Sequence, residues 1–64
     1  MMPDPTDHAV ELFNQAMESR AQGDLERAES LGAQAIEIFQ AALGAEHPQT
    51  QMARENLKEV AGST

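Results

Sequence analysis

The sequence has no cysteine, tryptophan or tyrosine, and its two phenylalanines are Phe13 and Phe39. Without cysteine, the chain can form neither a disulfide framework nor a thiolate metal site. Two phenylalanines offer no platform for stacked bases and little material for an aromatic ligand pocket. No segment approaches the roughly 18 consecutive apolar residues of a membrane span.

Basic residues are also scarce. Four Lys+Arg against eleven Asp+Glu give a net charge of −7, and the isoelectric point is near 4.4. Such a chain repels phosphate backbones and anionic lipid surfaces, so neither nucleic acid nor a membrane is expected as a partner. The residues after Met1 are acidic and lack an apolar run, so we expect no leader peptide and a cytoplasmic location.

A length of 64 residues predicts one domain, residues 1–64. The apolar surface that so short a chain can bury does little more than offset the conformational entropy lost on ordering it. A lone monomer is therefore expected to be marginally stable. Without cross-links, self-association or a partner is the remaining way to bury more surface.

Proline and glycine divide the sequence into three segments, predicted to be helices over about 5–22, 24–43 and 48–61. No stretch alternates as a strand would, so the predicted fold class is all-α. The residues that favour helix starts or ends at these boundaries are Asp4, Pro5, Gly23, Asp24, Gly44, His47, Pro48 and Gly62.

The middle helix has an apolar arc of about 160°, wide enough to contact two neighbouring helices. Its centre carries small residues that allow close approach, namely Ala28, Gly32, Ala35 and Ala42. The third helix has a stripe of only about 100° and an otherwise polar surface, as expected of a cap with a solvated outer face. Its stripe comprises Thr50, Ala53, Leu57, Val60 and Ala61. Met52 lies off this stripe and is interpreted as a single exposed apolar residue.

The first helix has more apolar surface than one neighbour can cover, about 180°. Leu12 and Ala16 suit packing within the chain, which leaves the other side of the arc partly exposed. The sequence predicts a partner or dimer interface on that side, formed by Ala9, Val10, Phe13, Met17 and Arg20.

The passage from Ala16 through Gly23-Asp24 to Ala28 and Ala35 resembles a tetratricopeptide repeat. That family places small residues where its two antiparallel helices cross and Gly-Asp or Gly-Asn at the turn between them. The following order, Leu43-Gly44, then Glu46-His47-Pro48, then Thr50, is similar to the longer repeats of kinesin light chains and their bacterial relatives. The resemblance implies an antiparallel helical hairpin plus a capping helix, with no enzymatic activity.

The resemblance amounts to one repeat plus the first helix of another, whereas repeats of this kind normally need about three copies. It also has departures: Gln15, Ser19 and Gly32 stand where large apolar or aromatic residues are usual. We therefore expect an assembly module that forms a homodimer or higher homo-oligomer through its first helix. The alternative is a monomeric adaptor that binds a peptide or basic protein on the same face, since the family's concave surface is built from first helices.

A small metal-dependent or hydrolytic enzyme is a remote alternative. His8 with Asp7 or Glu11 could present a metal-binding pair, but a polar first turn explains these residues more simply. His47 is expected to cap the helix that begins at Pro48 or to close the loop before it. Ser19 is expected on the helix surface without a nearby base. No catalytic, cofactor-binding or metal-binding residue is predicted.

Overall fold

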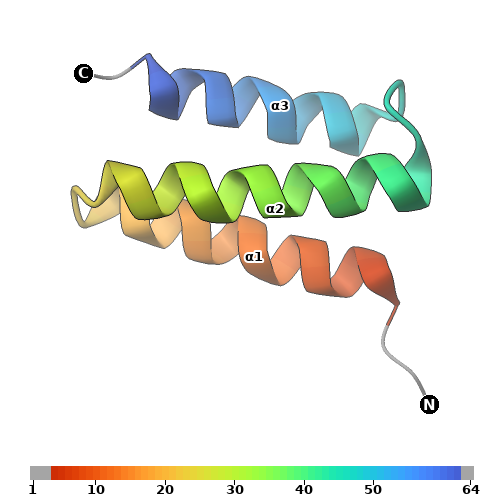
Figure 1. Cartoon of the computed structure of the whole chain (residues 1–64), viewed down its shortest axis with the longest axis horizontal. Coiled ribbons are helices and arrows are strands. Elements are labelled where there is room, and N and C mark those ends of the chain that lie inside the picture. The colour runs from red at the N-terminus through yellow and green to blue at the C-terminus, as the bar shows by residue number, and fades with distance from the viewer. Residues whose placement is uncertain (1–3, 63–64) are drawn as a thin grey trace.

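The computed structural model describes residues 4–62 and shows three helices, with the second between the first and the third (Figure 1). They are α1 (Pro5–Ala21), α2 (Leu25–Leu43) and α3 (Pro48–Ala61). The all-α prediction is confirmed, and the first helix ends one residue earlier than expected. The chain start, on which the absence of a leader was predicted, and the side chain of Ala61, expected in the α3 stripe, lie outside the described residues.

Two aspartates begin the first two helices as the sequence predicts. The Asp4 carboxylate oxygen Oδ1 accepts a hydrogen bond from the Thr6 N–H at 3.3 Å. Asp24 Oδ1 accepts one from the Arg27 N–H at 3.2 Å. Each bond satisfies an amide that has no partner within its helix. These short side chains therefore fix where α1 and α2 start.

The two connections turn on glycines with positive φ, Gly23 at 86° and Gly44 at 92°. This left-handed region of φ is costly for residues with a Cβ atom, which explains glycine at both helix ends. At the second connection, His47 Nδ1 accepts a hydrogen bond from the Gln49 N–H at 3.1 Å. The expected capping role of His47 is confirmed.

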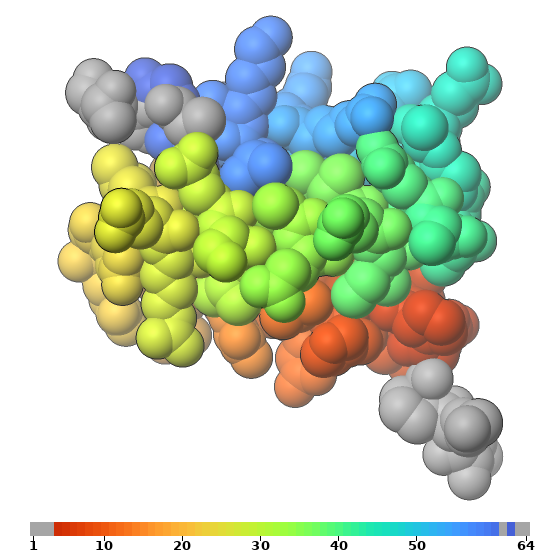
Figure 2. Space-filling model, viewed as in Figure 1, coloured from red at the N-terminus to blue at the C-terminus, as the bar shows by residue number. Residues whose placement is uncertain are grey.

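The middle helix, α2, packs against both α1 and α3, whereas α1 and α3 touch each other only slightly. In Figure 2 the side chains of α2 form a continuous band between those of its two neighbours. A core cluster joins all three helices and consists of Ala9, Leu12, Ala35, Ile36, Phe39 and Ala53. As predicted, α2 lies at the centre, and its contacts with α1 and α3 hold the three helices together.

Small residues on α2 set the closeness of this packing. Ala28, Gly32 and Ala35 are buried, as predicted, and a Cβ atom added at Gly32 would lie 3.0 Å from Leu57 Cδ1 of α3. Ala42, also predicted at the helix contact, is exposed. It lies where α1 begins and borders a shallow hollow with Pro5, so no helix covers it.

The three helices form a thin molecule, with extents of 37 × 25 × 13 Å. The 13 Å dimension is close to the diameter of one helix. Each helix therefore keeps a large part of its surface uncovered by the rest of the chain.

Within residues 4–62, no helix combines the length and apolar character needed to cross a membrane.

Candidate interaction surface

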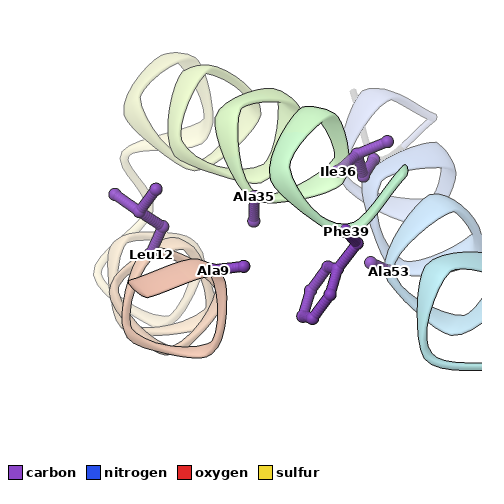
Figure 3. Close-up of a cluster of buried hydrophobic side chains, with 6 residues drawn as sticks. All are labelled: Ala9, Leu12, Ala35, Ile36, Phe39 and Ala53. Atoms are coloured by element: carbon purple, nitrogen blue, oxygen red, sulfur yellow. The ribbon is translucent and has the colours of Figure 1, made fainter. Parts of the chain in front are cut away.

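A groove runs between α1 and α3, with α2 as its floor. Figure 3 shows the ring of Phe39 reaching from α2 into the space between Ala9 of α1 and Ala53 of α3. Toward the N-terminal ends of α1 and α3, the groove opens into a hollow of about 240 Å³. We call this the α1/α3 hollow, and it is lined by Val10, Phe13, Asn14, Phe39, Gln49, Met52 and Ala53.

Two of the predicted interface residues line this hollow and a third lies beside it. Val10 is 40% exposed, and Phe13 is half-buried against the core cluster. Met17, which is 37% exposed, joins Phe13 at a narrow continuation of the groove that encloses only about 10 Å³. The structure thus places Val10, Phe13 and Met17 along one wall of the groove.

Ala9 does not belong to this surface. Its side chain is 0% exposed and is part of the core cluster. On the helix it lies between the stripe that packs on α2 and the groove wall, and close packing of α2 covers it completely. The prediction that Ala9 contacts a partner is therefore wrong, because the residue lies behind the surface.

Arg20 has a partner within the chain. Its Nη1 atom lies 3.7 Å from Oε2 of Glu59, so this ion pair links α1 to α3. Arg20 follows Met17 by one helical turn and therefore lies beyond the narrow part of the groove. The pair ties the two walls together at the end away from the hollow.

Met52 belongs to this surface although the sequence suggested an isolated residue. It is 54% exposed and lines the α1/α3 hollow from α3, together with Val10 and Phe13 of α1. A helical wheel of α3 alone puts Met52 off the apolar stripe, because the stripe marks contact with α2. The signal that identifies Met52 is its position next to Ala53, on the side of α3 that borders the groove.

The large exposed apolar side chains therefore gather around the groove. Among residues 4–62, the exposed large hydrophobic residues are Val10, Met17 and Met52, and all three border the groove. The hollow is lined only by apolar side chains and two uncharged amides, Asn14 and Gln49. In a chain with a net charge of −7, this uncharged region is distinctive. Its chemistry suits burial against another apolar surface.

The residues considered for metal binding or catalysis do not assemble into a site. Over the described residues, no three His, Asp or Glu side chains gather as metal ligands would. His8 and Asp7 are exposed on the first turn of α1, and His47 Nδ1 is engaged by the Gln49 amide. Ser19 is buried, contrary to expectation, because it continues the α1 stripe of Leu12 and Ala16 that packs inward.

Comparison with known protein families gives one match. A family model described as a tetratricopeptide repeat matches residues 14–49, which is more than half of the chain. The matched region spans the C-terminal part of α1 from residue 14, all of α2 and the start of α3. No curated protein and no solved structure matches the chain significantly.

Proposed function

Because the chain belongs to the tetratricopeptide repeat family, a family of protein-interaction modules that are typically not enzymes, we propose that it self-associates through the surface around the α1/α3 hollow. The single observation that carries this proposal is the gathering of Val10, Met17 and Met52 around one groove. Isolated exposed apolar residues are common on protein surfaces, but a contiguous set marks an interaction site.

The size of the face suits a dimer. The broad face measures 37 Å by 25 Å, which is about 900 Å² in outline. A stable protein interface buries about 800 Å² on each partner. The outline of one face is thus comparable with the area that a partner must cover, and burying the apolar residues around the groove would add contacts that a 64-residue chain cannot supply alone.

A second candidate function is binding of a foreign peptide in the groove by a monomeric adaptor. The observation that favours it is the concavity, a hollow of about 240 Å³ between two helices. With a net charge of −7 on the chain, such a peptide would carry apolar anchors flanked by Lys or Arg. Self-association and peptide binding would use the same wall of α1 and would exclude each other.

Substitution of glutamate on the α1 wall tests both functions. We expect Phe13→Glu and Val10→Glu to abolish a dimer, because each would bury an unpaired carboxylate in the interface. Val10 is exposed, so its variant retains the fold even if loss of Phe13 from the core unfolds the chain. The readout is solution mass by sedimentation equilibrium at micromolar concentration, with circular dichroism to check folding.

Gln15→Glu is the matched control, since Gln15 is exposed on α1 and lines a polar hollow rather than the groove. It should leave the mass unchanged. A folded wild-type chain with the monomer mass of 6.9 kDa would contradict self-association. If that monomer captures a Lys/Arg-flanked apolar peptide and Val10→Glu abolishes the capture, the adaptor function is correct.

We also predict a relationship to kinesin light chains, a single domain and a cytoplasmic location. Similarity to kinesin light chains rests on the order of residues from Leu43 to Thr50. A single domain over residues 1–64 and a cytoplasmic location rest on length and composition. None of the three is needed for the interaction proposed at the groove.

A further inference from the structure

We propose that the dimer is two-fold symmetric and that each copy inserts its Met52 side chain into the α1/α3 hollow of the other. This inference rests on the proposed self-association and specifies its geometry. It follows from an exposed apolar side chain at the rim of an apolar hollow, both on one face.

Met52 is the exposed side chain available for insertion. Its 54% exposure is the highest among the exposed large hydrophobic residues of the described chain. It also lines the hollow that opens toward Val10 and Phe13. A two-fold axis passing beside Met52 would place the Met52 of each copy over the hollow of the other. Such a surface is self-complementary, as a two-fold interface requires.

The hollow has the chemistry to hold a methionine. Its walls include Val10 and Ala53, and two aromatic rings, Phe13 and Phe39, contribute to the lining. The unbranched thioether adapts to irregular apolar spaces, and sulfur makes favourable contacts with aromatic rings. The inserted side chain would therefore fill space that the isolated chain leaves open.

The polar groups at the hollow are compatible with a second copy. Asn14 and Gln49 contribute amides, which carry both donors and acceptors and can pair with the same amides of a symmetric partner. No charged side chain lines the hollow. Two chains of like charge would therefore meet at their centre without burying carboxylates against each other.

Cysteine crosslinking tests this geometry sharply, because the chain contains no cysteine. Met52→Cys and Val10→Cys variants are mixed in equal amounts, allowed to exchange and mildly oxidised. We expect disulfides that join position 52 of one chain to position 10 of the other to predominate, since inserted Met52 would lie against Val10 of the other copy. Mass spectrometry of peptide digests identifies the pairing.

A matched control for the crosslinking comes from α2. Glu37→Cys places a cysteine at an exposed position of α2, on the side of the helix opposite Phe39 and therefore away from the groove. Mixed with Val10→Cys under the same conditions, it should give few disulfides between the two variants. Equal crosslinking by Glu37→Cys and Met52→Cys would mean that the disulfides report random collision, and would contradict the proposed geometry.

Substitution at the same position provides an independent readout. Met52→Gln should weaken dimerisation by about tenfold, because a polar amide would replace the buried thioether, whereas Met52→Leu should weaken it much less. Both variants should fold normally, since Met52 is largely exposed in the single chain.

The outcomes separate this inference from the proposed function. A dimeric wild type that gives mainly disulfides between two copies of position 10 and is indifferent to Met52→Gln would overturn the Met52 geometry and leave self-association intact. The same result would indicate that the α1 helices face each other directly. A monomeric wild type would overturn both proposals.

Discussion

At the scale of single residues, the face of a helix on which a side chain lies was largely predictable, but its exact burial was not. Leu12 and Ala16 pack inward and Val10 and Met17 remain exposed, as the periodicity indicates. Met52 is exposed as predicted, but it borders the groove rather than standing alone. Ala9 was assigned wrongly because it lies at the edge of its stripe. At an edge, burial depends on the neighbouring helix, which a wheel of one helix does not contain.

Thr50 is the residue whose chemistry least suits its surroundings. Its side chain is 0% exposed, and its hydroxyl oxygen Oγ1 has no hydrogen-bond partner. We expect Thr50→Val to stabilise the chain by about 1 kcal/mol, because it removes a buried polar group and keeps the shape. Urea unfolding monitored by circular dichroism measures the change. Thr50→Ala, which leaves a void, should instead destabilise, and a loss of stability in Thr50→Val would contradict the assignment.

At the scale of elements, the sequence predicted all three helices because their ends carry specific local signals. Asp4 and Asp24 supply caps, and Gly23 and Gly44 adopt the positive φ needed to leave a helix. The groove could not be predicted in this way. It arises from the relative placement of α1 and α3, which share few contacts and are positioned by α2.

The start of α3 offers a test of how much one capping side chain contributes to the stability of the chain. His47 Nδ1 accepts the Gln49 amide, so His47→Ala should lower the free energy of unfolding by about 1 kcal/mol. His47→Asp should retain stability, because aspartate is a strong N-cap and its charge suits the helix dipole. Thermal unfolding of the two variants beside the wild type provides the comparison. Equal stability of the wild type and His47→Ala would show that the cap contributes nothing.

At the scale of the whole molecule, charge and shape act in opposite directions on self-association. The chain carries a net charge of −7, so two copies repel each other. Each copy nevertheless offers an uncharged apolar hollow. Composition revealed the charge and the shortage of buried surface, but it could not reveal that the uncharged residues come together, because they belong to α1, α2 and α3 in turn.

Ionic strength therefore distinguishes the two candidate functions. Added salt screens repulsion between like-charged copies, so dimerisation should strengthen when salt rises from about 0.05 M to about 0.5 M. Binding of a peptide flanked by Lys or Arg should weaken over the same range, because salt screens attraction. Sedimentation equilibrium follows the first and fluorescence anisotropy of a labelled peptide the second. Dimerisation that weakens with salt would contradict an interface centred on the hollow.

The order in which the helices pack also affects how the chain folds. Each major packing contact joins helices that are neighbours in sequence, first α1 with α2 and then α2 with α3. Chains dominated by such local contacts lose little loop entropy on the way and fold within microseconds to milliseconds. The groove needs both α1 and α3 in place on α2, so it exists only when all three helices are docked.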